Sequence, residues 1–233
     1  MTKRVALVTG VGPGTGSAIV RRFAEGRYEV AMIARTEKRL MQLAHETSGT
    51  HAFAADVTDA DQMDEVLGRI THELGTPEVV IHNAVGGVFG NFQEIDPAVL
   101  EQNFQINVMA LLHLVRRTAP SMIEAGHGVI IASGNTSALR GKANFAGFAP
   151  TKAAQRVLAE SIARELGPKG IHVAYIIIDA VVDLEWTRKM RPDVPDNFFI
   201  QPRDIAAEVW HVAHQPRSAW SFNVELRPFG EHW

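Results

Sequence analysis

Two kinds of apolar pattern alternate along the chain. Short continuous runs of apolar residues, many of them β-branched, are typical of strands that are buried in a sheet. Between these runs, apolar residues recur every three or four positions, as they do on one side of an amphipathic helix. The predicted strands cover residues 5–8, 30–33, 51–54, 79–82, 129–132, 172–178 and 222–226.

The helical segments are defined by their apolar positions, which are Met63, Val66, Leu67 and Ile70 in the first, Phe104, Val108, Leu111, Leu112 and Val115 in the second, and Ala154, Val157, Leu158 and Ile162 in the third. Thr58 and Asp61 have the spacing of a capping box in front of the first segment. Pro97 lies near the start of the second segment, and the third runs from about Pro150 to Leu166.

The alternation of strands and helices predicts an α/β domain. It indicates a parallel sheet of about seven strands with helices on both faces, and the whole chain, residues 1–233, is expected to form this one domain. The irregular stretch 183–201 is rich in proline and charge and precedes a last helix that begins at Pro202. Ligands of such sheets bind beyond the carboxyl ends of the strands, so we expect residues 183–201 to cover a substrate.

Composition narrows the class of protein. The net charge is −3 and no run is rich in lysine and arginine, which argues against nucleic acid as a partner. The chain has no cysteine, which excludes disulfides and thiolate catalysis. No apolar segment approaches the ~20 residues of a membrane span, and the first residues, MTKR, lead directly into the first strand. We therefore expect a soluble, cytoplasmic protein.

Two smaller patterns lie near the C-terminus. Glu208, His211 and His214 recur every third position of the last predicted helix, but without a fourth ligand they are interpreted as surface residues, and no metal site is predicted. The final residues 229–233 are more apolar than a free tail usually is, so they are expected to pack on a neighbouring subunit.

The first strand leads into a loop with glycine at positions 10, 12, 14 and 16, and a helical pattern follows at once. Within the sequence VALVTGVGPGTG, Thr9, Gly10, Gly14 and Gly16 match the spacing T-G-x-x-x-G-x-G, with Thr15 between the last two glycines. A strand, a glycine turn and a helix bring bare backbone and helix N–H groups close to phosphate. We expect this loop to bind the phosphates of a nucleotide.

Further motifs follow the loop in order: Ala55-Asp56-Val57, His82-Asn83-Ala84, Asn107 in a long helix, and Lys152 at the start of another. With them the chain resembles the short-chain dehydrogenase/reductase family over nearly its whole length. The resemblance implies a Rossmann-like, three-layer, doubly wound domain, a nicotinamide dinucleotide, a small-molecule substrate and a homodimer or homotetramer. It also implies cofactor contacts, with Asp56 near the adenine, Asn83 and Ala84 along the ribose, and Val57, Lys152, Ile178 and Val181 elsewhere on the cofactor.

The end of the second strand favours NADP over NAD. An NAD site uses a carboxylate there to accept from the ribose 2′-hydroxyl, whereas NADP requires a cation for its 2′-phosphate. This strand runs into Ala34-Arg35-Thr36, which has no acid. Arg35 can form a planar, charge-assisted pair with phosphate. The alternative is that Arg35 is a solvated residue at the start of a surface helix and that NAD binds instead.

The resemblance fails at the catalytic positions. The family's reductases have a tyrosine four residues before the lysine and a serine thirteen residues before the tyrosine; here these positions are Phe148 and Asn135. Phe148 is expected to share a helix face with Lys152, but phenylalanine cannot donate a proton. Asn107 and Lys152 remain and can hold a chain of water molecules. The other tyrosines, Tyr28 and Tyr175, lie in or near core strands and are not expected to substitute.

Asn135 has two interpretations: its amide donates to a substrate carbonyl, or Asn135, Thr136 and Ser137 only cap a turn. Three functions are consistent with these residues. The first is an NADP(H)-dependent oxidoreductase for carbonyl or hydroxyl substrates with a non-standard proton donor. The second is an enoyl-thioester-type reductase of C=C bonds, in which Phe148 is less damaging. The third is an inactive dinucleotide-binding sensor or assembly protein.

Overall fold

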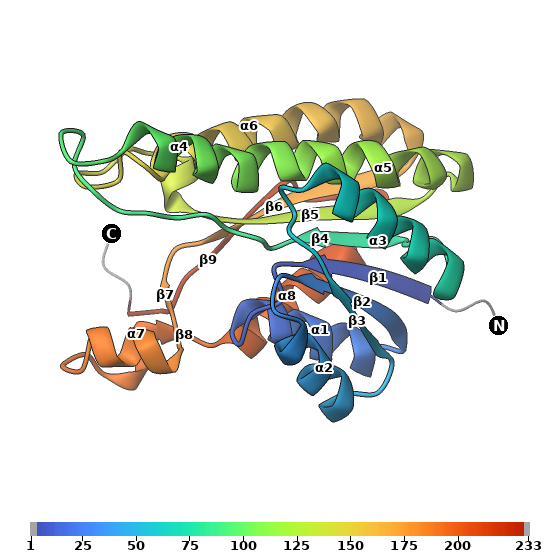
Figure 1. Cartoon of the computed structure of the whole chain (residues 1–233), viewed down its shortest axis with the longest axis horizontal. Helices are drawn as coiled ribbons and strands as arrows, with labels where there is room; N and C mark the ends of the chain where they lie inside the picture. Colours follow the sequence, from blue (N-terminus) through green and yellow to red (C-terminus); the bar gives the residue numbers. More distant parts are fainter. Residues whose placement is uncertain (1–3, 231–233) are drawn as a thin grey trace.

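The computed structural model describes residues 4–230. The helices and strands follow the predicted alternation (Figure 1). The strands are β1 Arg4–Thr9, β2 Tyr28–Ala34, β3 Thr50–Ala54, β4 Val79–His82, β5 Gly128–Asn135, β6 Ile171–Ile178, β7 Val181–Val182, β8 Phe199–Ile200 and β9 Asn223–Leu226. The α-helices are α1 Thr15–Glu25, α2 Glu37–Glu46, α3 Ala60–Glu73, α4 Pro97–Phe104, α5 Ala110–Ala125, α6 Ala149–Leu166, α7 Glu185–Met190 and α8 Pro202–Ala213.

Within the described residues, the main sheet has seven parallel strands in the order β3-β2-β1-β4-β5-β6-β9. This confirms the predicted sheet, and every predicted strand has a counterpart in it. Strand β5 continues to Asn135, three residues beyond the predicted end, because it pairs with β6 as far as Asn135 and Ile178. Polar residues at the end of β5 conceal this extension in the sequence.

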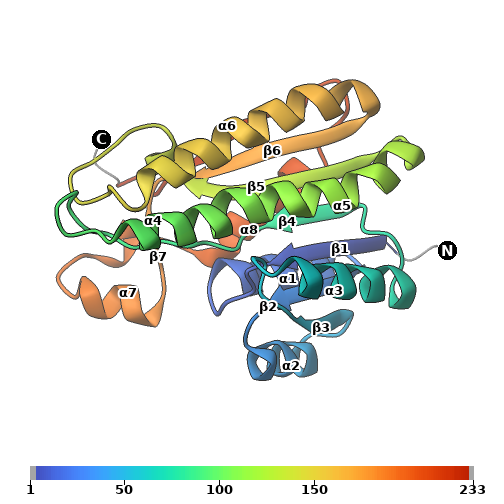
Figure 2. The same ribbon diagram turned by 45° about the horizontal axis from the view of Figure 1, so that its top comes forward.

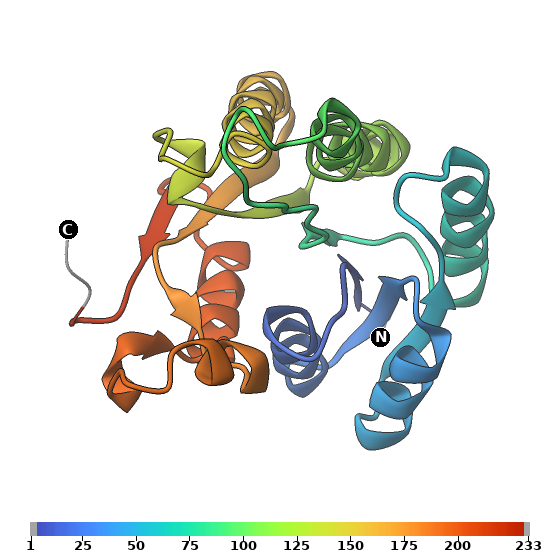
Figure 3. The same cartoon turned by 60° about the vertical axis from the view of Figure 1, so that its left-hand side comes forward.

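Helices cover both faces of the sheet, as Figure 3 shows: α3, α5 and α6 lie on one face and α1, α2 and α8 on the other. Successive side chains of a strand point to opposite faces. In β1, Leu7 therefore joins the apolar core under α3, α5 and α6, whereas Ala6 and Val8 join the core under α1 and α8. This double covering is why the strands read as continuous apolar runs.

The direction of chain progression across the sheet reverses between β1 and β4. From β1 the chain moves outward to β2 and β3, then returns to β4 on the other side of β1 and moves on to β5 and β6. In sheets of this topology, a crevice opens beyond the carboxyl ends of the strands at the point of reversal. The glycine loop and residues 83–90 leave the sheet at this place.

The second predicted helix is one continuous helical rod with a wider turn inside it. Helix α4 passes into a π-helical turn, Gln105–Met109, which passes into α5. Asn107 lies in this turn, and π turns are frequent at functional sites. The apolar spacing predicted the rod but not the extra residue.

Two local predictions are wrong. The N-cap of α3 is Asp59, which accepts from the Gln62 N–H, so Thr58 and Asp61 form no capping box. Thr58 instead donates to the Asp56 carboxylate. The 183–201 segment is not irregular: it contains α7, a 3₁₀ turn and β8, which pairs with β7. Of the predicted C-terminal contact, Phe229 is 89% exposed, and residues 231–233 lie outside the described part.

Candidate active site

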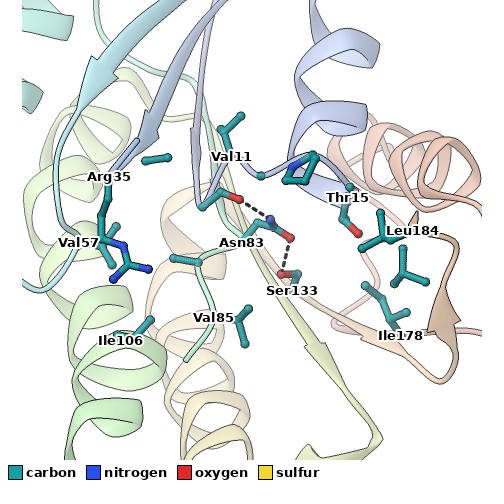
Figure 4. A pocket seen from close by; sticks show the side chains of 18 of the residues that line it. Val11, Thr15, Arg35, Val57, Asn83, Val85, Ile106, Ser133, Ile178 and Leu184 are labelled. Carbon is teal, nitrogen blue, oxygen red and sulfur yellow. Dashed lines mark hydrogen bonds between the residues drawn. The ribbon is translucent and has the colours of Figure 1, made fainter. Parts of the chain in front are cut away.

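A cleft of about 480 Å³ lies in the crevice beyond β1, β4 and β5. Its wall is formed by the glycine loop, the ends of β2 and β3, the residues after β4, the end of β5, Lys152 of α6 and the residues after β6. Figure 4 shows this wall from close by, with Arg35 and Val57 on one side and Leu184 and Ile178 on the other.

Two positions of the loop after β1 require glycine. Gly10 has a φ of +70°, and a Cβ atom there would lie 2.4 Å from the Ala84 backbone. A Cβ atom at Gly16 would lie 2.6 Å from the Gly10 carbonyl oxygen. The loop therefore packs tightly on the residues after β4 and on the start of α1, whose N-cap, Gly14, has no side chain to cap it. Backbone N–H groups at this helix end are available to an anion.

Asn83 connects the glycine loop to β5. Its Nδ2 donates to the Gly10 carbonyl (2.9 Å), and its Oδ1 accepts from the Ser133 hydroxyl (2.9 Å), as drawn in Figure 4. Because both ends of the amide are engaged, Asn83 fixes the loop relative to the strand and leaves the nucleotide to be bound by backbone. Ala84 lies beside it in the wall of the cleft.

The side of the cleft near β2 carries positive charge. Arg35 and Arg39 line it, and the guanidinium of Arg35 lies beside Val57 on the same side of the cleft (Figure 4). Asp56 is the one acid among the described residues of the wall, and its Oδ1 accepts from the Thr58 N–H and hydroxyl. Two exposed cations and an occupied carboxylate suit a phosphate at this end.

Lys152 lies at the inner side of the cleft, in the first turn of α6. The residue is 1% exposed, and its Nζ donates to the Ser133 carbonyl (2.9 Å) and to Gln155 Oε1 (2.5 Å). Burial disfavours the ammonium form and lowers the pKa of Lys152 to about 7. Burial, together with the nearby charge of Lys152, also lowers the pKa of His82 to about 4. Lys152 is therefore the group in the cleft that exchanges a proton near neutral pH.

Asn107 is fully buried and does not line the cleft. Its Oδ1 accepts from the Gly86 N–H (3.0 Å), and its Nδ2 donates to the Gly86 carbonyl (2.7 Å) and to Thr151 Oγ1 (2.8 Å). The part of Asn107 in a chain of water molecules therefore stays a prediction, while its side chain is engaged within the protein. It joins the loop after β4 to the start of α6, and so positions Lys152 indirectly.

Phe148 is also outside the wall of the cleft. It is the N-cap of α6 rather than a residue of its first turn, and unlike Lys152 it does not line the cleft. Its ring is 4% exposed and packs against Gly87 and, edge to face, against Phe89 at 5.4 Å between centroids. Burial among other aromatic side chains stabilises the Phe148 ring, whereas a position in the cleft would expose it to water.

Asn135 caps a turn, as one of its two interpretations predicted, and its donation to a substrate carbonyl stays a prediction. Its Oδ1 accepts from the Ser137 N–H (3.0 Å) and caps a short 3₁₀ turn. The residue also lines the cleft. The cap uses only the oxygen, so the amide NH₂ is the part of Asn135 that can donate toward a ligand.

The remaining predicted residues divide between wall and core. Twelve of the positions predicted from the sequence line the cleft: Gly10, Gly14, Thr15, Gly16, Arg35, Asp56, Val57, Asn83, Ala84, Asn135, Lys152 and Ile178. Thr9 does not, because its hydroxyl is buried 3.1 Å from His82 Nδ1. Val181 does not either; its neighbours in sequence, Ala180 and Val182, line the cleft instead.

Several wall residues were not predicted as site residues, notably Arg39, Val85, Ile106, Ser133, Gly134 and Leu184. Arg39 follows Arg35 by one helical turn, a signal that could have been used. Leu184 approaches Gly14, where a Cβ atom would lie 2.7 Å from Leu184 Cδ2. Leu184 and Trp186 place the 183–201 segment against the cleft, whereas Phe198 and Phe199 do not line it.

Two further observations bear on the class of protein. Within residues 4–230, no cluster of three or more histidine or acidic side chains has an arrangement that could hold a metal ion. Across the same residues, no helix has the length and apolar character that crossing a membrane requires.

Residues 4–194 match the family model described as short chain dehydrogenase, so the chain belongs to this family. An uncharacterised oxidoreductase of Staphylococcus aureus is 25% identical over 230 residues, which are 98% of each chain. Among solved structures, a short-chain dehydrogenase from Rhodopseudomonas palustris is 30% identical, with a TM-score of 0.83 over 97% of this chain and 99% of that one. A metagenomic short-chain oxidoreductase in complex with NADP is 26% identical, with a TM-score of 0.85 over 98% of each chain.

Proposed function

We propose that the protein is an NADP(H)-dependent oxidoreductase that transfers hydride between nicotinamide and the carbonyl or hydroxyl carbon of a small molecule. The observation that carries the proposal is the composition of this cleft, whose wall contains two arginines near β2 and the buried Lys152 at its inner side. The NADP bound to the metagenomic relative supports the choice of cofactor. In this proposal the protein works in the cytoplasm as a homodimer or homotetramer.

The residues of the wall fit this cofactor. The glycine loop and the start of α1 are placed to bind the pyrophosphate, and Arg35 and Arg39 the 2′-phosphate of the adenosine half. The bound cofactor supplies or accepts the hydride. In this proposal the Asn135 amide donates to the substrate oxygen, and Lys152 exchanges the proton that must accompany hydride transfer; the presence of both residues in the wall supports these roles.

The first prediction concerns Arg35. Replacing it by serine removes a charge-assisted contact to the 2′-phosphate, so NADPH binding should weaken by roughly 10- to 100-fold. NADH binding should change less than about twofold, because NADH has no phosphate there. Fluorescence titration of both nucleotides against wild type and Arg35→Ser measures the two changes. Equal loss of both nucleotides, or no affinity for either in wild type, would refute the cofactor assignment.

Turnover separates the competing functions. NADPH oxidation is followed at 340 nm with ketones, aldehydes and enoyl thioesters as substrates. Oxidation with ketones or aldehydes supports the proposal. Tight NADPH binding without any turnover favours the inactive binding protein, and turnover of enoyl substrates alone favours the C=C reductase.

A further inference from the structure

A chain of three buried polar side chains lies behind the cleft, between α6 and β6. Gln155 Oε1 accepts from Lys152 Nζ (2.5 Å) and from the Tyr175 hydroxyl (3.1 Å). All three residues are at most 1% exposed. Tyr175 and Gln155 do not line the cleft, and none of the functions considered above uses them.

The orientation of Gln155 is determined by its other end. Its Nε2 donates to the Asn107 carbonyl (2.7 Å) in the π turn. An amide whose nitrogen must face a carbonyl has its oxygen directed the opposite way, here toward Lys152 and Tyr175. The assignment of oxygen and nitrogen in Gln155 therefore follows from its three neighbours, because each of them offers the complementary group.

Tyr175 can reach Gln155 because position 134 is glycine. A Cβ atom at Gly134 would lie 2.2 Å from the Tyr175 hydroxyl oxygen. Gly134 is directly beyond Ser133, whose carbonyl accepts from Lys152, and it lines the cleft. Because Gly134 has no side chain, the buried Tyr175 hydroxyl can lie directly behind the wall of the cleft, close to Lys152.

Two of the three hydrogen-bonding positions of the Lys152 amine are occupied. Nζ donates to Ser133 O and to Gln155 Oε1, and since Lys152 also lines the cleft, we infer that its third position faces the cavity. An ammonium offers a third N–H there. A neutral amine keeps both donated hydrogen bonds and offers its lone pair in the same direction. The same two acceptors therefore hold the Lys152 amine in both its charged and its neutral form.

We propose that Gln155 is a positioning residue which, held by the Asn107 carbonyl and the Tyr175 hydroxyl, aims the Lys152 amine into the cleft as the proton donor of the reaction. The proposal rests on the oxidoreductase function above. In the reductive direction the carbonyl carbon gains hydride while its oxygen takes a proton from the Lys152 ammonium, directly or through one water molecule. Lys152 becomes a neutral amine and regains a proton from solvent. Oxidation reverses each transfer.

The neutrality of Gln155 is what suits Lys152 to this role. A carboxylate at this position would hold the lysine as an ammonium, whereas an amide accepts one N–H without adding charge, so burial keeps the pKa near 7. The titratable groups around it are neutral as well. His82 on β4 has a pKa of about 4, and burial raises the pKa of Tyr175 on β6 above its usual range. Arg156 is the nearby cation, acting on Tyr175.

The test measures the Lys152 pKa itself, from the ¹³Cε shift of lysine-labelled protein without nucleotide, assigned with Lys152→Met. Gln155→Glu places a negative charge on the amine and should raise the pKa by roughly one to three units. Gln155→Met removes the acceptor and should lower it. Gln42→Met, on the exposed face of α2, is the matched control and should leave it unchanged.

The pH profile of turnover supplies the second reading. The apparent pKa of turnover that belongs to Lys152 should move with the pKa measured by NMR, to higher pH in Gln155→Glu and to lower pH in Gln155→Met. A Lys152 pKa that neither variant moves, or a profile that stays fixed while the pKa moves, overturns the positioning role. A wild type that shows the expected pKa shifts but no turnover with any substrate overturns the oxidoreductase function instead.

Discussion

At the scale of the residue, Lys152 lowers the stability of the fold for the same reason that it suits proton transfer. Burial lowers its pKa from 10.5 to about 7, so below pH 7 the folded protein must hold a charge in a poorly solvated place. Between pH 7 and 10.5 the unfolded chain binds more protons than the folded one. The free energy of unfolding therefore rises with pH over this window.

Because Lys152 makes the free energy of unfolding rise with pH, its replacement in Lys152→Met should remove this dependence. The unfolding free energy of wild type, relative to the variant, should increase by up to ~1.4 kcal/mol per pH unit from pH 7 to 9.5 and should be flat from pH 5.5 to 6.5. Urea denaturation of both proteins at several pH values measures the difference. Parallel curves across the whole range would show that Lys152 titrates normally.

Residues whose role depends on local chain geometry were predictable. Gly10 and Gly16 follow from a strand–turn–helix pattern, and Arg35 from its place after a strand. Gln155 and Tyr175 were not, because their hydrogen bond joins elements twenty residues apart whose register no local pattern fixes. Phe148 was misplaced because a helix face was assigned to a residue that only caps the helix.

At the scale of the element, one side chain links separate parts of the 183–201 segment. Arg188 of α7 donates to Asp183 (Nε to Oδ1, 2.5 Å) and to Asp196 (Nη1 to Oδ1, 2.5 Å). The same arginine holds the pKa of Asp183 at about 2. Proline and charge in this stretch indicated a loop, because its order comes from ion pairs and a two-residue strand pair rather than from an apolar period.

We predict that Arg188→Met loosens this segment. Leu184 and Trp186 line the cleft, so NADPH affinity should fall by roughly three- to tenfold, since the nucleotide must then order the segment on binding. Amide hydrogen exchange of residues 184–200 should accelerate. Lys189→Met, which removes a surface pair with Glu185 on the same helix, is the control. Unchanged exchange in Arg188→Met would contradict the prediction.

At the scale of the whole molecule, apolar side chains remain exposed on neighbouring helices. Ile123 of α5 and Val157 of α6 are 38% and 58% exposed, and the two helices lie side by side in both Figure 1 and Figure 2. Packing two copies of the chain on this layer would remove these surfaces from water. The sequence predicts an oligomer only through the family resemblance, because helical periodicity does not separate a core face from a subunit interface.

Light scattering should therefore give a mass two or four times 25.5 kDa. Val157→Glu places a charge in the expected interface and should shift the protein toward the monomer by at least about tenfold in dissociation constant. Val85→Glu, in the loop after β4 and 61% exposed, is a control away from these helices. A wild type that remains at 25.5 kDa at high concentration would exclude the interface.

The π turn between α4 and α5 determines the directions in which the side chains of α5 point around the helix axis. One additional residue in a helix rotates the subsequent side chains by about 100° around the axis. With this offset, Asn103 donates to the Gly147 carbonyl on one side of the turn while Leu111 and Leu114 enter the sheet core on the other. A regular helix of the same sequence would allow only one of these contacts, either the Asn103 hydrogen bond or the packing of Leu111 and Leu114. The π turn allows both.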